Sequence, residues 1–215
     1  MIKAVIFDLD GVLVSTDYLH YNAWKRLADE EGIVGFTESD AVRQRGVSRM
    51  ASLEILLEKS EKVYSDAKKT ELADRKNGYY VESLSQVTKE SVLCGVTDFI
   101  SLMKEKGMAL AVGSASKNAP VILEKTELMP LMDTVVCGLE VTRSKPDPQV
   151  FLMAAERLGV EPCCCLVVED ADAGIEAAKA GGMYALAVGA AKGNPKADWR
   201  TDNLATATEV LDLIF

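Results

Sequence analysis

Short apolar runs alternate with stretches of helical period along most of this chain. The apolar runs cover residues 4–7, 108–112, 134–137, 165–168 and 184–188, and helical patterns between them cover residues 98–106, 118–126, 148–158 and 171–180. A continuous apolar run is typical of a strand that is buried on both faces. Because strands that alternate with helices form parallel sheets, the pattern predicts an α/β fold with a doubly wound parallel sheet. We expect residues 190–200 to form a loop and residues 207–215 a short closing helix.

A long segment separates the first strand from the second. The roughly one hundred residues between Asp10 and Ser114 exceed the usual length of a loop, so they are expected to hold an inserted structure. Apolar residues recur there at helical spacing in three stretches, near residues 19–28, 53–57 and 66–84. We therefore predict a small all-helical cap domain, residues 16–87, inserted into a core domain formed by residues 1–15 and 88–215.

Helix starts can also be located from residue types. Thr16 and Asp17 precede the first helical stretch of the insertion and can cap it. In the core, Thr97 can cap a helix over residues 98–106, which Gly107 ends.

Two carboxylates follow the first strand directly. Asp8 and Asp10 are one residue apart, so in extended backbone they can point to the same side while Leu9 points into the interior. In open α/β sheets, reactive groups gather beyond the carboxyl ends of the strands. Asp8 could attack a phosphorus centre while Asp10 exchanges a proton, and Gly11 permits a tight turn that brings backbone amides near an anion. A polar turn that merely closes a strand explains these residues equally well.

Three more distant motifs also carry polar residues near strand ends. Hydroxyls and amides suited to phosphate oxygens follow the second strand, in the stretch Ser114, Ala115, Ser116, Lys117 and Asn118. Lys145 lies in a loop before a helix, where it can neutralise a phosphate. The adjacent acids Glu169 and Asp170 end another buried strand and suit a hard cation such as Mg²⁺.

In this order, the motifs resemble those of the haloacid dehalogenase superfamily of phosphoryl-transfer enzymes. The resemblance extends from Asp8 to the last apolar strand. It implies that Asp8 is the nucleophile that becomes an aspartyl phosphate and that Asp10 is the general acid and base. It also implies that Ser114 and Lys145 hold the transferring phosphate. The implied Mg²⁺ ligands are Asp8, the backbone carbonyl of Asp10, Glu169 and Asp170.

Residues of the predicted cap are similar to one branch of this superfamily, the β-phosphoglucomutases. The matching positions are His20, Trp24, Lys25, Gly46, Val47, Ser48, Arg49, Ser52, Leu53, Arg75, Lys76, Asn77, Tyr80 and Val81. Members of the branch interconvert β-D-glucose 1-phosphate and glucose 6-phosphate through glucose 1,6-bisphosphate. The resemblance therefore implies a small phosphorylated sugar as substrate, Mg²⁺ as cofactor and glucose 1,6-bisphosphate as activator and intermediate.

The resemblance also implies roles in the cap. His20 and Lys76 are expected to join the catalytic group, in a network that links the cap position to Asp10, and Thr16 is expected at the hinge. Arg49, Ser116 and Asn118 would hold the phosphate that is not being transferred. The full set expected at the substrate or its phosphates is Gly11, Thr16, Trp24, Arg45, Gly46, Arg49, Ser114, Ala115, Ser116, Lys117, Asn118 and Lys145.

One position departs from the branch, which commonly has a lysine before the stretch Gly46–Arg49. This chain has Arg45 there. Arginine keeps the positive charge, but it is longer, planar and fixed in protonation. The sugar preference is therefore open, whereas the phosphate chemistry is unaffected.

Two alternatives to a mutase remain open. A hydrolase acting on a sugar phosphate or another small phosphate would use the same core, with water discharging the phosphoenzyme when cap closure is looser. A non-catalytic sugar-phosphate binder is the third hypothesis. The combination of Asp8, Asp10, Lys145 and Asp170 argues against it, because a binder needs no nucleophile beside an acid and base.

The composition limits which classes of binding partner and which cellular location we expect for this protein. The net charge of −9 disfavours nucleic acid as a partner. No apolar run in the sequence approaches the length of a membrane span, and the N-terminus enters a strand without a signal peptide. We expect a cytoplasmic protein that acts as a monomer.

The five cysteines fit a reducing compartment. Three of them are consecutive, at residues 163–165, and adjacent residues of extended backbone point to opposite faces, so they are not expected to form a zinc or redox site. Cys94 and Cys137 lie in apolar surroundings and are expected to be small packing residues.

Overall fold

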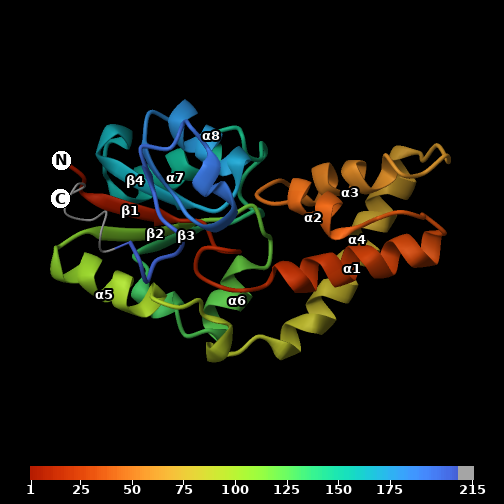
Figure 1. Cartoon of the computed structure of the whole chain (residues 1–215), viewed down its shortest axis with the longest axis horizontal. Coiled ribbons are helices and arrows are strands. Elements are labelled where there is room, and N and C mark those ends of the chain that lie inside the picture. Colours follow the sequence, from red (N-terminus) through yellow and green to blue (C-terminus); the bar gives the residue numbers. More distant parts are fainter. Residues whose placement is uncertain (208–215) are drawn as a thin grey trace.

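Parallel strands form a single sheet in the order β3-β2-β1-β4-β5-β6 in the computed structural model, which describes residues 1–207 (Figure 1). The strands are β1 (Ala4–Phe7), β2 (Ala109–Gly113), β3 (Thr134–Val136), β4 (Cys165–Glu169), β5 (Tyr184–Ala187) and β6 (Trp199–Arg200). The predicted doubly wound α/β fold is confirmed, and the five predicted strands are present. The two-residue strand β6 lies within the expected loop, because so short a pairing leaves no apolar pattern. The closing helix expected over residues 207–215 lies almost entirely outside the described residues.

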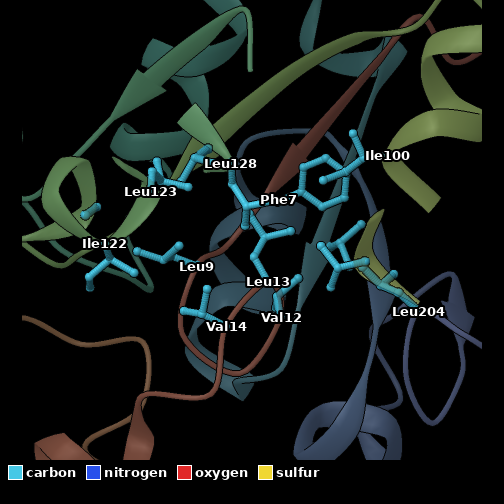
Figure 2. Packing of buried hydrophobic residues seen from close by; sticks show 14 of the residues in the cluster. Phe7, Leu9, Val12, Leu13, Val14, Ile100, Ile122, Leu123, Leu128 and Leu204 are labelled. Atoms are coloured by element: carbon cyan, nitrogen blue, oxygen red, sulfur yellow. The ribbon is translucent and has the colours of Figure 1, made fainter. Parts of the chain in front are cut away.

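Helices cover both faces of the sheet (Figure 1). They are α5 (Val96–Glu105) and α6 (Ala119–Lys125) on one face and α7 (Gln149–Leu158) and α8 (Asp172–Ala180) on the other. Side chains of β1 alternate between the two faces. Phe7 packs in the same apolar cluster as Ile100 of α5 and Leu123 of α6 (Figure 2). Its ring lies 6.0 Å from that of Phe99. Ile6 belongs to the opposite cluster, with Phe151 and Ile175. Two apolar layers therefore hold the strand ends that carry the polar motifs.

Four helices lie between β1 and α5, at one end of the molecule (Figure 1). They are α1 (Asp17–Glu31), α2 (Glu38–Arg43), α3 (Arg49–Leu57) and α4 (Asp66–Ser83). They enclose a hydrophobic cluster of their own, which includes Trp24, Leu27, Leu53, Leu56 and Leu72. The short and polar helix α2 was not predicted; a capping box between Thr37 and Asp40 starts it. We call α1–α4 the helical cap, and its limits at residues 16 and 87 stay a prediction.

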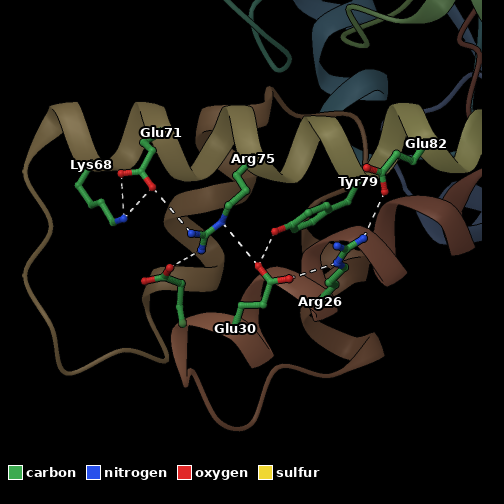
Figure 3. A network of polar contacts seen from close by, with 8 residues as sticks. Arg26, Glu30, Lys68, Glu71, Arg75, Tyr79 and Glu82 are labelled. Atoms are coloured by element: carbon green, nitrogen blue, oxygen red, sulfur yellow. Dashed lines mark hydrogen bonds and ion pairs between the residues drawn. The ribbon is translucent and has the colours of Figure 1, made fainter.

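Charged side chains join α1 and α4 along their exposed surface (Figure 3). Arg26 and Arg75 both contact Glu30, Tyr79 donates a hydrogen bond to the same carboxylate, and Arg26 lies 3.7 Å from the centre of the Tyr79 ring. Exposed ion pairs contribute little each, so apolar packing between the helices is the main stabilising contact.

The remaining ordered segments are short 3₁₀ turns. They are η1 (Leu84–Gln86), η2 (Lys89–Ser91), η3 (Met129–Leu131), η4 (Pro162–Cys164) and η5 (Gly189–Gly193). No helix in residues 1–207 is long and apolar enough to span a bilayer.

Several local predictions were wrong. The cap residue of α5 is Gly95, and Thr97 lies inside the helix. The Thr16 side chain does not cap α1, because its hydroxyl donates to Asp10 instead. Cys94 is exposed rather than packed. Cys163 and Cys164 lie in the turn η4, not in extended backbone, and their free thiols are 4.0 Å apart.

Replacement of a helical glycine by alanine should change the free energy of unfolding in opposite directions at two positions. An added Cβ at exposed Gly78 in α4 meets no atom of residues 1–207 within 4 Å, whereas at Gly174 in α8 it would lie 1.9 Å from Glu169 Oε1. We expect Gly78→Ala to raise the free energy of unfolding by about 1 kcal/mol. Gly174→Ala should lower it by about 1–3 kcal/mol, because the buried helix must move away from the carboxylate. Urea denaturation of both variants checks this; equal effects would contradict it.

Candidate active site

A cavity of about 830 Å³ lies between the carboxyl ends of the central strands and the helical cap. Of the predicted site residues, its wall contains Asp8, Asp10, His20, Trp24, Arg45, Gly46, Arg49, Lys76, Ser114, Ala115, Ser116, Lys117 and Asn118. The others lie behind this wall and contact it, namely Gly11, Thr16, Lys145, Glu169 and Asp170. The fold therefore brings residues from both ends of the chain to one place.

Sheet order explains why the polar residues of the core meet. Strands β2, β1 and β4 are neighbours, and all three are parallel. Asp8 follows β1, Ser114 follows β2 and Glu169 ends β4, so their side chains gather at the same edge of the sheet. Leu9, between the two acids, is fully buried in the hydrophobic core (Figure 2).

A buried lysine, Lys145, contacts both Asp8 and Glu169. Lys145 Nζ lies 2.5 Å from Asp8 Oδ1 and 2.5 Å from Glu169 Oε1, and its side chain has no exposed surface. The second oxygen of Glu169 accepts a hydrogen bond of 3.0 Å from the Ala171 amide. Burial alone would lower the pKa of Lys145, but the two negative charges and the hydrogen bonds outweigh it and raise that pKa. Lys145 therefore stays an ammonium at neutral pH.

The acids at this edge fit a divalent cation. Oxygens of Asp8, Glu169 and Asp170 lie within 4.8 Å of one another. Burial, followed by repulsion among the acids, raises the pKa of Asp170. Burial also raises the pKa of Glu169, because the charge of Lys145 offsets it only in part. Such a set of crowded hard oxygen donors is suited to Mg²⁺, which would relieve the repulsion.

Gly11 lies against this acidic cluster. Its φ angle is +82°, and an added Cβ would come within 2.2 Å of Asp170 Oδ2. Any side chain here would displace the carboxylate. Gly11, which we predicted to bind phosphate, thus contacts a proposed metal ligand in this structure.

Asp10 also lines the cavity, but its hydrogen-bond partner differs from that of Asp8. The Thr16 hydroxyl donates a hydrogen bond to Asp10 Oδ1. Burial and the nearby charge of Asp8 raise the pKa of Asp10 to about 7, against the opposing effect of the Thr16 hydrogen bond. A carboxyl with a pKa near neutrality can both release and accept a proton at the pH of the cell.

Buried Lys76 and partly buried His20 form a pair in the helical cap. Lys76 Nζ lies 2.8 Å from His20 Nδ1, and the His20 ring stacks on Tyr80 at a centroid distance of 3.9 Å. The Lys76 ammonium also lies 4.7 Å from the centre of the Trp24 ring. Burial and the charge of Arg49 lower the pKa of Lys76 to about 7, although the negative charge of Asp10 opposes this lowering. Burial lowers the pKa of His20 as well.

A second polar group lies where the helical cap meets the core. Arg49 Nη2 and Asn118 Nδ2 both donate to Asn77 Oδ1, at 2.8 and 3.1 Å. The backbone N–H of Asn118 donates to Ser116 Oγ at 3.2 Å, so the start of α6 is tied to the same cluster. Lys117 is exposed at its margin.

Arg45 reaches the core rather than only the open cavity. Its guanidinium lies 2.8 Å from Asp17 Oδ2 and 3.9 Å from Asp170 Oδ2. The neighbouring Gly46 has a φ of +70°, and a Cβ on it would lie 3.1 Å from the Cβ of Ala171. The turn Arg45–Gly46 therefore packs directly against the acidic cluster.

Two polar residues were not assigned a role from the sequence. Asp17, expected only as a helix cap, pairs with Arg45, and burial raises its pKa. Asn77 was noted in a motif but given no function. The spacing of Ala73, Asn77 and Tyr80 along α4 marks one helical face, and that signal could have directed attention to Asn77.

A family profile and characterised relatives match most of this chain. The family profile of haloacid dehalogenase-like hydrolases matches residues 2–182. A β-phosphoglucomutase of Bacillus subtilis is 40% identical over 87% of this chain and 83% of its own length. A phosphorylated carbohydrates phosphatase of Thermotoga maritima is 35% identical over 84% of this chain and 82% of its own length.

A solved structure extends the similarity to the fold. The β-phosphoglucomutase of Clostridium difficile matches with a TM-score of 0.92 at 35% identity, over 99% of this chain and 96% of that protein. Sequence and structure agree over both the sheet and the helical cap. The chain therefore belongs to the haloacid dehalogenase-like hydrolase family, in its β-phosphoglucomutase-like branch.

Proposed function

We propose that this protein is a β-phosphoglucomutase, which interconverts β-D-glucose 1-phosphate and glucose 6-phosphate through glucose 1,6-bisphosphate. One observation carries the proposal: a single cavity has two separate sets of groups suited to phosphate. Lys145 and Ser114 lie beside Asp8, and Arg49 and Asn118 meet through Asn77 at the junction with the helical cap. A bisphosphate needs both sets at once, whereas removal of one phosphate by water needs only the first.

The first transfer would begin at Asp8. Its carboxylate, held by Lys145, attacks the phosphorus of glucose 1,6-bisphosphate in line with the leaving sugar oxygen and forms an aspartyl phosphate. The permanently charged Lys145 offsets negative charge on the transferring oxygens. Mg²⁺ bound by Asp8, the Asp10 carbonyl, Glu169 and Asp170 would supply further positive charge beside those oxygens.

Asp10 would donate a proton in one transfer step and accept a proton in the other. As the sugar oxygen leaves, protonated Asp10 donates to it, and the resulting carboxylate can later take the proton from the hydroxyl that attacks the aspartyl phosphate. Thr16 fixes the direction of the Asp10 side chain through its hydrogen bond. The phosphoenzyme then passes the phosphoryl group to the C6 hydroxyl of β-D-glucose 1-phosphate. The glucose 1,6-bisphosphate so formed turns around beneath the helical cap, so that its C1 phosphate faces Asp8.

Exclusion of water would separate this reaction from hydrolysis. The turn Arg45–Gly46 packs on Ala171 and reaches Asp170, which covers one side of the acidic cluster. His20 and Lys76 add polar side chains to the cap side of the cavity, where they would contact sugar hydroxyls. With water kept from the aspartyl phosphate, a sugar hydroxyl becomes the preferred acceptor.

A Mg²⁺-dependent sugar-phosphate phosphatase is the alternative. Relatives favour it directly, since the T. maritima protein and a fructose-1-phosphate phosphatase of Escherichia coli, 31% identical over 86% of this chain, are named as phosphatases. Asp10 would then activate water instead of a sugar hydroxyl. A cytoplasmic location, a monomeric state and the lack of a nucleic-acid partner stay predictions.

The assay that tests the proposal follows both products together. Purified protein is incubated with β-glucose 1-phosphate, Mg²⁺ and a trace of glucose 1,6-bisphosphate, and glucose 6-phosphate and free phosphate are measured over time. A mutase forms glucose 6-phosphate far faster than free phosphate and depends on the bisphosphate. Free phosphate as the sole product would establish the phosphatase instead.

Replacing the proton-transfer group should stop turnover without removing the site. We expect Asp10→Ala to lower kcat by about 10²–10⁴, the usual contribution of general acid and base catalysis. Thr16→Val, which keeps Asp10 but removes its hydrogen-bond donor, should cause a smaller loss. Steady-state kinetics at saturating Mg²⁺ measure both, with thermal unfolding as the control for folding. Turnover of Asp10→Ala equal to that of the natural protein would refute this role.

A further inference from the structure

The Asn77 side chain lines the cavity where the helical cap meets the core. Its amide oxygen accepts hydrogen bonds from Arg49 Nη2 and Asn118 Nδ2, at 2.8 and 3.1 Å. Asn77 and Arg49 come from helices α4 and α3 of the helical cap, whereas Asn118 stands at the start of α6 in the core. One oxygen atom therefore joins the two parts of the molecule across the cavity.

The charge balance around Arg49 is incomplete. Its side chain is 19% exposed, and its nearest acid is Asp74, whose carboxylate is 3.6 Å away and 73% exposed. Burial lowers the pKa of Arg49 without removing its charge, because a guanidinium keeps its proton in proteins. Asn77 offers this cation a hydrogen-bond acceptor but no negative charge. A positive charge with a neutral partner inside a cavity favours an anionic ligand.

We propose that Asn77 is a positioning residue for the phosphate that is not being transferred, an inference that rests on the function proposed above. In the free protein its amide oxygen takes the place of a phosphate oxygen and holds the Arg49 and Asn118 donors together. When phosphate enters, it replaces that oxygen at both donors. A half-turn of the amide then presents Nδ2 as a donor to the phosphate, since an amide carries an acceptor and a donor at its two ends.

A neutral amide is essential to this role. Asn77→Asp keeps the shape and the acceptor, but its carboxylate neutralises Arg49, offers no donor and repels a phosphate dianion. Asn77→Ala removes the acceptor without adding repulsion. The two variants should therefore differ from each other, which a residue that only fills space or stabilises α4 would not produce.

The chain offers a matched control in Asp74. Asp74 also contacts Arg49 from helix α4, but its side chain is 73% exposed and makes no hydrogen bond or ion pair with the core among residues 1–207. Asp74→Ala removes a partner of the same guanidinium without touching Asn118. An effect confined to Asn77 would thus separate positioning across the cavity from a general disturbance of Arg49.

The test is a binding titration that does not depend on turnover. Asp8→Asn, which removes the proposed nucleophile, serves as the parent, and glucose 1,6-bisphosphate is titrated into it by calorimetry in the presence of Mg²⁺. We expect Asn77→Asp to raise the Kd by about 10-fold or more, Asn77→Ala by only about 2–4-fold, and Asp74→Ala by less than about 2-fold. Thermal unfolding of each variant verifies folding.

Two results would overturn the inference. One is an Asn77→Asp variant that is folded and binds the bisphosphate as tightly as the parent, and the other is an equal loss in Asn77→Asp and Asp74→Ala. In the otherwise natural chain, Asn77→Asp should raise KM for the bisphosphate while kcat at saturation is kept. If the natural protein forms no glucose 6-phosphate, the proposed function fails, but the titration still decides the role of Asn77.

Discussion

The contact between Lys145, Asp8 and Glu169 is the constraint on which the rest of the structure depends. Three acids gather at one edge of the sheet because β1 and β4 are adjacent, and they would repel one another without a cation. Lys145 supplies a positive charge that has no exposed surface and lies 2.5 Å from two of them. Removing one partner from such a buried cluster leaves an uncompensated charge, at a cost of about 3–5 kcal/mol.

The helical cap places further charged side chains beside the cluster of Lys145, Asp8 and Glu169. Arg45 approaches Asp170 from the cap, Asp17 holds its guanidinium, and Gly46 lets the turn approach Ala171 closely. On the far side of the cavity, Arg49 and Asn118 meet at Asn77. Cap and core are thus joined at two places, one beside the reacting acids and one at the proposed site of the other phosphate. A bisphosphate spanning both places would have its two ends held by different parts of the fold.

Much of this organisation could be predicted from the sequence, because it is encoded locally. The strands are unbroken apolar runs, and the polar residues follow them directly, so the α/β fold and the meeting of Asp8 with Glu169 follow from parallel topology alone. Contacts between side chains of the helical cap and side chains of the core carry no such signal. The pairing of Arg45 with Asp170 and the bridge at Asn77 depend on how the helical cap packs on the core, and polar side chains have no periodicity that reveals their partners.

The central claim is that Asp8, charge-balanced by Lys145, is the group that receives a phosphoryl group. A crystal structure with Mg²⁺ and beryllium trifluoride, which imitates a phosphoryl group on a carboxylate, tests it most directly. The account predicts beryllium bonded to an Asp8 carboxylate oxygen, with Lys145 Nζ donating to a fluorine, and no such adduct in Asp8→Asn. Beryllium trifluoride bound on another side chain, with Asp8 free, would contradict it.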